Sequence, residues 1–487
     1  MAAGDGAGRD PVRAAAFLPN GSDTMMEDLL QWVSRINEYL SDYVLIFLLV
    51  GSGVFFTIRT RFVQVRCFAE GWRHAFGRFS LHGGSQGNGL SSYQALSTAV
   101  AAQVGTGNII GAAGAILTGG PGAIFWMWLI AFFGMATIYA EAVLAQSTRV
   151  EDADGTLHGG PVYYIKKAFP HRGGTFLAVF FAVATVLSLG FMGCMVQANS
   201  IGATSQSAFG VPAWTVGIVI AVCAGAVFLG GISWLAGVTE KIVPVMALLY
   251  LVGGLFVMIA RIECIPATFA CIFKYAFMPE ALIGGGIGQA LKTAVSQGVK
   301  RGLFSNEAGM GSTPHAHAVA RVASPHVQGT VAMIGVFIDT AVVLTMTALI
   351  IISTVYVDGP LAGATGATYR EMLASTGLNQ TNLVQYAIAS VSSTAIGNIF
   401  VAVSLLFFAF STIISWNYFG KINFQYLFGR KGLIIYSVLA VLFIFGGTLM
   451  QNDLVWELQD MFNQLMVFPN LLALLFFRSV SNTHPSR

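Results

Sequence analysis

Long apolar stretches separated by short polar connections dominate the hydrophobic pattern of this chain. Eleven of the stretches approach or exceed the length that crosses a bilayer as a helix, about 20 apolar residues. The pattern therefore predicts an all-α polytopic membrane protein. The predicted spans are 42–58, 92–118, 121–147, 175–205, 212–231, 239–260, 281–300, 327–356, 388–418, 432–450 and 455–478.

The polar ends of the chain bound a single transmembrane domain. We expect residues 1–39 to be a polar N-terminal extension, 40–480 the transmembrane domain and 481–487 a short cytoplasmic tail. No basic segment followed by a hydrophobic core opens the chain, so we predict no cleaved signal peptide.

The second apolar stretch is interrupted near its middle by Gly105-Thr106-Gly107-Asn108. Glycine is a poor helix former, so this cluster favours a break in the helix. Unwound backbone inside a bilayer is tolerated only where it is buried in protein or lines a wet cavity. Secondary transporters hold small zwitterions and cations at such breaks, so we interpret this helix as half of a binding site. Close packing between helices is the structural alternative for any single glycine.

A second interruption lies at the seventh stretch. This stretch opens with a glycine-rich segment, 284–288, and is followed by Phe304-Ser305-Asn306-Glu307-Ala308-Gly309-Met310-Gly311. Without the first span, ten spans remain, which suits an inverted repeat of five plus five whose halves begin at the two interrupted helices. The halves share no obvious identity by eye, so this symmetry rests on span count and break position.

Composition and charge agree with a membrane location. Hydrophobic residues make up 55% of the chain and charged residues 10%, whereas soluble domains average about 25% charged residues. The five cysteines show no metal-binding spacing, the eight histidines form no HExxH motif, and we expect no nucleic-acid partner.

Lysine and arginine predict the orientation. With an outside N-terminus, 18 of the 25 Lys and Arg fall in or beside cytoplasmic connections and six fall outside, while Lys292 lies within a span. Because cytoplasmic loops carry the excess of positive charge, we expect the N-terminus outside and the C-terminus in the cytoplasm. The expected location is the plasma membrane, of the bacterial inner-membrane type.

Three motifs resemble the alanine/glycine:cation symporter family. They are Val104–Ile109 (VGTGNI), Gly119–Leu129 with Gly134 (GGPGAIFWMWL), and Arg301–Ser312 (RGLFSNEAGMGS). The resemblance covers about residues 30–480. It implies a LeuT-type fold with one added N-terminal helix, and sodium-driven uptake of alanine, glycine or similar small amino acids.

The resemblance also implies a substrate site. The Gly-x-Gly-Asn break would lie against the amino acid, with Thr106 and Gly107 nearest its carboxylate. Gln103 is neutral at a position where family members can carry a polar or charged group near the substrate amine. Gln197 would contact the substrate or bond another helix, and Trp416 would wall the pocket or lie in an interfacial aromatic belt. The expected substrate residues are Gln103, Gly105, Thr106, Gly107, Asn108, Gln197 and Trp416.

Sodium is the coupling ion that the resemblance implies, with no other cofactor. Ser411 and Thr412 match the family's hydroxyl ligands. The backbone carbonyls of Ala101 and Val104 would supply further oxygens to the same ion.

Other ionisable residues at membrane depth need partners because charge is costly there. Glu141 and Asp339 are each a structural hydrogen-bond acceptor or a coupling-ion group, and Lys292 pairs with an acid or extends to the interface. Glu307, His315 and His317 belong either to a solvated cytoplasmic loop or to an inner gate.

The leading hypothesis is a sodium-coupled symporter that imports small neutral amino acids, such as alanine, glycine and serine, by alternating access. Proton coupling is the alternative that Asp339 keeps open. A channel would show a pore loop or charged ring. An intramembrane enzyme would need a nucleophile–base pair or metal ligands at depth, and the histidines fall in connections.

Overall fold

A computed structural model describes residues 21–77, 89–152, 155–284, 286–366, 368–450 and 452–477. The expected tail at 481–487 lies outside these residues. Helices dominate the described chain, and its two strands, β1 (Val150–Glu151) and β2 (Leu157–His158), form a small antiparallel hairpin.

The helical segments follow in chain order, with η marking π- or 3₁₀-helical turns. They are α1 (Gly21–Tyr39), η1 (Leu40–Leu45), α2 (Ile46–Arg59), α3 (Val63–Arg66), α4 (Phe68–Phe76), α5 (Ser92–Gln103), η2 (Gly107–Gly111), α6 (Ala112–Gly119), α7 (Ala123–Thr148), α8 (Pro161–Ala168), α9 (Arg172–Thr185), η3 (Val186–Gly193), α10 (Cys194–Phe209), α11 (Ala213–Leu229), α12 (Gly231–Ala260), η4 (Ile262–Cys264), α13 (Ile265–Phe277), α14 (Glu280–Ile283), α15 (Ile287–Asn306), α16 (Pro314–Ala318), α17 (Pro325–Val336), η5 (Phe337–Leu344), α18 (Thr345–Ile351), η6 (Ile352–Val357), α19 (Tyr369–Thr376), α20 (Leu383–Ala389), α21 (Thr394–Phe428), η7 (Arg430–Gly432), α22 (Leu433–Gly447) and α23 (Asn452–Phe476).

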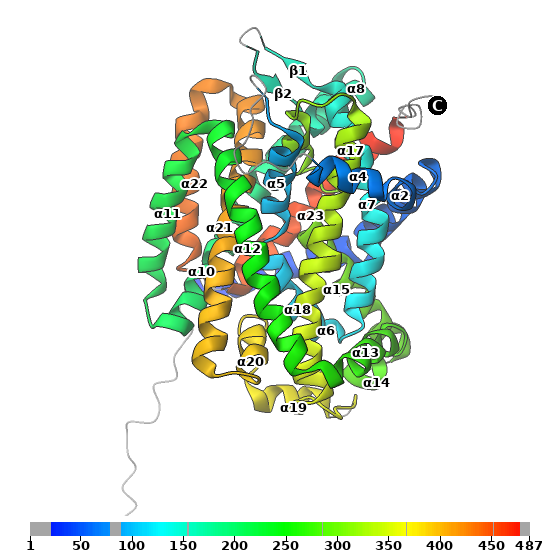
Figure 1. Cartoon of the computed structure of the whole chain (residues 1–487). Coiled ribbons are helices and arrows are strands. Elements are labelled where there is room, and N and C mark those ends of the chain that lie inside the picture. The colour runs from blue at the N-terminus through cyan, green and yellow to red at the C-terminus, as the bar shows by residue number, and fades with distance from the viewer. Residues whose placement is uncertain are drawn as a thin grey trace, which may run out of the picture.

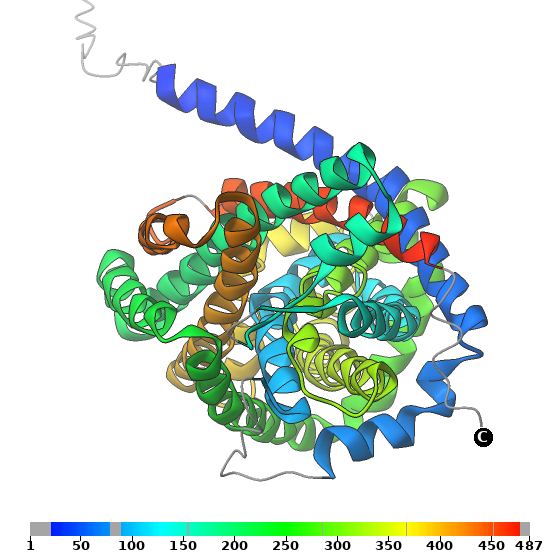
Figure 2. The same ribbon diagram turned by 90° about the horizontal axis from the view of Figure 1, so that it is seen from above.

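The long helices form one bundle (Figure 1). In that view α10, α11, α21 and α22 lie on one side and α7 and α15 on the other, while the hairpin and α8 lie at one end and α13, α14 and α19 at the opposite end. Seen along the bundle in Figure 2, the N-terminal helices run along its edge. The segment expected to be a polar extension thus contains α1, which packs against α23.

Within the described ranges, seven helices are long and apolar enough to cross a membrane, or eight if the bent pair α5 and η2–α6 is one span. The predicted count of eleven is therefore not confirmed, although each predicted stretch falls on helical structure. Three helices that we expected to span do not meet this criterion. α11 has only 17 residues, and α15 and α23 carry charged side chains that face other helices instead of lipid.

The seventh predicted span has a wrong boundary. We ended it at Lys300, whereas α15 continues through Arg301 to Asn306. Lys300 and Arg301 therefore lie within a helix and not in a connection between helices; Arg301 is buried and the Lys300 side chain is 11% exposed. Carboxylates on α23 pair with these two basic residues, so α15 can continue past them.

The interruption predicted in the second span is present. α5 begins with a capping box, in which Ser91 and Gln94 bond each other's backbone amides, and ends where Val104 turns extended (ψ 92°). The helix resumes at Gly107, and the two halves are bent by 48°.

The second interruption follows α15. Glu307 adopts a left-handed conformation (φ 59°), which a non-glycine residue rarely does. Gly309 and Gly311 also have positive φ, and regular helix resumes only at Pro314 in α16. The first break lies against the last turn of α15, which leads into the second break, since a Cβ added at Gly107 would be 2.8 Å from the Phe304 ring.

Candidate functional site

The hydroxyls expected to bind sodium lie on α21 against the end of α5. Thr412 Oγ1 is 2.9 Å from the carbonyl oxygen of Ala101 and 3.4 Å from that of Val104. Ser411 Oγ is 3.4 Å from the Ala101 oxygen. All four residues are buried. The structure therefore brings together two hydroxyls and two carbonyls, the oxygen ligands that transporters offer to sodium at an unwound helix.

Glycine is required at Gly105 for this approach. A Cβ there would lie 2.5 Å from Thr412 Oγ1 and 3.1 Å from the side-chain oxygen of Gln197. Any larger residue would push α21 away from the break.

Asp339 connects the two breaks. Its carboxylate accepts hydrogen bonds from Asn108 Nδ2 at 2.7 Å, from Ser305 Oγ at 2.9 and 3.0 Å, and from Thr340 Oγ1 at 2.8 Å. Asn108 also accepts from the amide of Gly105 at 3.0 Å. Asp339 is fully buried. It is thus a structural hydrogen-bond acceptor in this arrangement, and its carboxylate lies beside the first break.

Three buried polar atoms near the first break have no hydrogen-bond partner among the described residues. They are Thr106 Oγ1, Gln103 Oε1 and Gln197 Nε2. The opposite end of each glutamine is engaged, since Gln103 Nε2 donates to Asn306 O at 2.8 Å and Gln197 Oε1 accepts from the Thr106 amide at 3.1 Å. An unpaired buried polar group costs about 1–3 kcal/mol. The Gln103 oxygen can accept, the Gln197 amide nitrogen can donate, and the Thr106 hydroxyl can do either, so together these groups suit a zwitterionic ligand.

Trp416 is held rigidly inside the bundle. Its indole is 1% exposed, which excludes a position in a lipid-facing aromatic belt. Its Nε1 donates to Glu307 Oε1 at 2.5 Å, and its ring meets Phe304 edge to face at 5.6 Å between centroids. A Cβ on Gly193 would lie 2.5 Å from the indole. The indole therefore has fixed surroundings from α15, η3 and the second break.

Glu141 stabilises the second break. It accepts hydrogen bonds from the amide of Gly309 at 3.2 Å and from Asn470 Nδ2 at 2.6 Å. Asn470 also donates to the Gly309 carbonyl at 2.9 Å. These contacts support the structural alternative for Glu141.

The residues that follow the second break are not a solvated loop. Glu307, His315 and His317 are all fully buried. His315 bonds Ser312 O at 2.6 Å and Asn423 Nδ2 at 2.9 Å. This segment is therefore packed into the bundle, which leaves the inner-gate hypothesis open.

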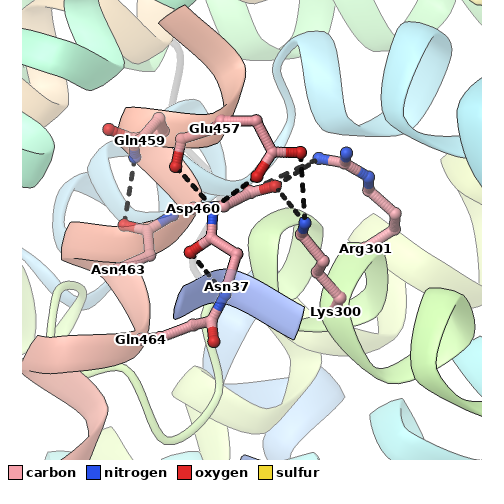
Figure 3. A network of polar contacts seen from close by, with 8 residues as sticks. All are labelled: Asn37, Lys300, Arg301, Glu457, Gln459, Asp460, Asn463 and Gln464. Carbon is pink, nitrogen blue, oxygen red and sulfur yellow. Dashed lines mark hydrogen bonds and ion pairs between the residues drawn. The ribbon is translucent and has the colours of Figure 1, made fainter. Parts of the chain in front are cut away.

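Sequence reasoning missed a group of four charged side chains and one asparagine beside the site. We name it the charged cluster: Asn37, Lys300, Arg301, Glu457 and Asp460 (Figure 3). Lys300 Nζ and Arg301 Nη1 of α15 lie 2.8 and 3.2 Å from Asp460 Oδ2 of α23. Asn37 of α1 donates to the Glu457 backbone oxygen at 2.7 Å. The cluster joins three helices.

Arg301 connects this cluster to the aromatic residues of the site. Its guanidinium lies 4.9 Å from the ring centroid of Trp456, and Trp456 lies 5.0 Å from Phe304. The sequence did contain a signal for this cluster, because basic and acidic residues at membrane depth need partners of opposite charge. The pairing itself was hard to predict, because 159 residues separate Arg301 from Asp460.

Curated relatives match the chain over almost its whole length. A sodium/alanine symporter, AgcS, from Methanococcus maripaludis is 40% identical over 93% of this chain and 96% of its own. A probable sodium/glutamine symporter, GlnT, from Bacillus subtilis is 38% identical over 93% and 90%. A putative sodium/proton-dependent alanine carrier protein, YrbD, also from Bacillus subtilis, is 38% identical over 92% and 90%.

Solved transporters share the fold. MhsT in complex with L-phenylalanine aligns with a TM-score of 0.56 at 14% identity, over 79% of this chain and 89% of its own. A manganese transporter of Eremococcus coleocola gives 0.51 at 14% identity, over 80% and 78%. At such low sequence identity, these structural matches show a shared LeuT-type fold and nothing about function.

The family model describes a sodium:alanine symporter family, which is consistent with the broken helices and the motifs. The relatives and the structural neighbours are likewise transporters and not enzymes. The family model matches residues 26–484, and this multi-pass membrane chain therefore belongs to the sodium:alanine symporter family.

Proposed function

We propose that this protein is a sodium-coupled symporter that imports small neutral amino acids, such as alanine, glycine and serine, by alternating access. The observation that carries the proposal is the set of unpaired buried polar atoms of Gln103, Thr106 and Gln197 at the first break. Membership in a family of sodium-coupled amino-acid carriers supports it.

The substrate would bind by its backbone groups at the break. Amides at the start of a half-helix favour an anion, so the carboxylate belongs near Thr106, Gly107 and Asn108, with Gln197 Nε2 as a further donor. The ammonium group belongs near the unpaired oxygen of Gln103. A neutral acceptor there suits a substrate whose net charge is zero.

Side-chain selection would come from Trp416. Groups that recognise the amino and carboxyl ends are common to all amino acids and cannot choose among side chains. The indole is fixed by its contacts with Glu307, Phe304 and Gly193, so it would form a rigid wall for a substrate bound at the break. The pocket would therefore favour small side chains.

Sodium would bind to Ser411, Thr412 and the carbonyls of Ala101 and Val104. These groups carry no formal charge, so the incoming ion supplies the only charge at that point. Proton coupling is the second candidate, favoured by one observation: Asp339 is a fully buried carboxylate beside the break.

We also propose an outside N-terminus and a cytoplasmic C-terminus, in a plasma membrane of the bacterial inner-membrane type. Lys300 and Arg301 no longer count toward a cytoplasmic connection. The remaining bias is 16 cytoplasmic against six outside basic residues, which still supports this orientation.

Uptake into proteoliposomes tests the proposal. Labelled alanine, glycine and leucine are offered with sodium, lithium or proton gradients imposed one at a time. We expect accumulation of alanine and glycine driven by sodium, and counterflow of labelled alanine, which a channel does not support. Accumulation driven by a proton gradient in the absence of sodium would replace the sodium mechanism with the proton one.

A further inference from the structure

A second group of metal-ligating side chains lies where α4 packs against α17, apart from the substrate site. Cys67 precedes α4, Glu70 lies in its first turn, and His326 is the second residue of α17. One ligand atom of each lies within 4.8 Å of the other two. His326 Nε2 is 3.3 Å from a Glu70 carboxylate oxygen.

The close contact of the two helices creates this arrangement. A Cβ on Gly71 would lie 2.5 Å from the carbonyl oxygen of Thr330, so only glycine lets α4 approach α17 here. Glu70 and His326 then face each other from the two helices. Cys67 and His326 are buried, while the Glu70 side chain is 42% exposed and leaves a path for an ion.

The three ligand types suit zinc, and so does the distance between the His326 and Glu70 ligand atoms. Zinc takes sulfur, imidazole nitrogen and carboxylate oxygen in tetrahedral geometry, with ligand atoms roughly 3.3–3.6 Å apart. The separation of 3.3 Å between His326 and Glu70 falls at that value. A thiol selects soft or borderline ions over Mg²⁺ and Ca²⁺. Three protein ligands leave one position for water.

A second contact orients the histidine. The Tyr139 hydroxyl lies 2.7 Å from His326 Nδ1. In protein metal sites, the ring nitrogen that does not bind the metal is held by such a partner, which fixes the tautomer and the ring orientation. Here it turns Nε2 toward Glu70.

We propose that Cys67, Glu70 and His326 bind a thiophilic divalent cation such as Zn²⁺, which fastens α4 to α17. Sequence spacing alone could not indicate this site, because Glu70 and His326 come from segments far apart in the chain. The proposal does not depend on the transported substrate.

The competing explanation is a cluster held only by hydrogen bonds. Burial, with a smaller effect of Glu70, raises the pKa of the Cys67 thiol. Without a metal, the thiol would therefore stay protonated and bond Glu70, which also pairs with His326. The two explanations predict different metal affinities.

Metal titration of the purified full-length protein, without a histidine tag, separates them. Zinc affinity is measured by competition with a chromophoric chelator, and cobalt is used as a spectroscopic substitute. We expect one zinc ion per chain and, with cobalt, the charge-transfer absorption of a thiolate ligand. Cys67→Ser and His326→Gln should abolish both signals. Tyr139→Phe should weaken zinc binding roughly 10–100-fold, as loss of an outer partner does.

Matched controls are available for both ligand types. Cys223 is an exposed cysteine on α11, and His74 lies one turn beyond Glu70, where it contacts Thr330. Cys223→Ser and His74→Gln should retain both signals. Wild-type protein that binds no zinc, or variants at Cys67 and His326 that bind it as tightly as wild type while monodisperse, would overturn the proposal in favour of the hydrogen-bonded cluster.

Discussion

The proposed sodium site and the charged cluster both lie inside the bundle beside a broken helix, yet the first consists of neutral oxygen atoms and the second of charged side chains. The sodium site consists of the neutral oxygens of Ala101, Val104, Ser411 and Thr412. The charged cluster consists of two basic side chains on α15 matched by acids on α23 (Figure 3).

This difference distinguishes a proposed ion-binding site from a contact between helices that is held by fixed charges. Buried full charges are retained only when they are paired, and losing one partner is strongly destabilising. Neutral carbonyls and hydroxyls can remain buried with or without an ion because they also bond each other, as Thr412 does with Ala101. The comparison predicts that changes in the charged cluster alter mainly stability, whereas changes in the sodium site alter mainly sodium dependence.

The largest expected effect is that of Asp460→Ala. The change leaves Lys300 and Arg301 buried without their shared partner, and breaking a buried pair in this way costs about 3–5 kcal/mol. We expect a large drop in the thermal unfolding temperature of the purified protein. As a control, adding Lys300→Met and Arg301→Met to this variant should restore much of the loss, because the two cations are removed and the remaining acid, Glu457, is partly exposed. A variant as stable as wild type would show that the cluster does not join α15 to α23.

Trp416→Ala should change selectivity and leave sodium dependence unaltered. One methylene in an apolar pocket is worth about 1–3 kcal/mol, so enlarging the pocket should raise leucine uptake relative to alanine. Trp416→Phe serves as the control and should shift the ratio less. An unchanged alanine-to-leucine ratio in folded, membrane-inserted protein would remove Trp416 from the selectivity role.

The smallest expected effect is that of Asn37→Ala on α1. It removes hydrogen bonds to Glu457 while the ion pairs of Lys300 and Arg301 with Asp460 remain. A typical hydrogen bond contributes about 0.5–1.5 kcal/mol, so we expect a small decrease in unfolding temperature with uptake retained. A loss as large as that of Asp460→Ala would mean that α1 is an essential part of the cluster.

The elements that sequence predicted best are those that depend on local chemistry. Two glycines around Thr106, followed by Asn108, lower the helix propensity of one short segment, so the first break could be predicted from this local cluster. The charged helices α15 and α23 were harder to predict as helices inside the bundle. Hydropathy ended the seventh span at its charges, whereas partners on another helix allow α15 to continue to Asn306.

The candidate site likewise contains contacts that the sequence predicted and contacts that it did not. The meeting of Thr412 with Ala101 follows from motifs that resemble a known family, and the structure brings these residues together. The bond between Trp416 and Glu307 could not be predicted from sequence, because it depends on the left-handed turn at Glu307. Contacts between distant segments at irregular backbone require the folded structure.

The sodium dependence of alanine uptake by Thr412→Val tests the central claim most directly. Valine keeps the shape of threonine and removes the hydroxyl, and a bond to a charged group is worth about 1.5–3 kcal/mol, or roughly 10–100-fold in affinity. We predict that the sodium concentration for half-maximal uptake in proteoliposomes rises by that factor in Thr412→Val and changes little in Thr412→Ser, with both proteins folded. Equal half-saturating sodium for wild type and Thr412→Val would contradict a sodium site between α5 and α21.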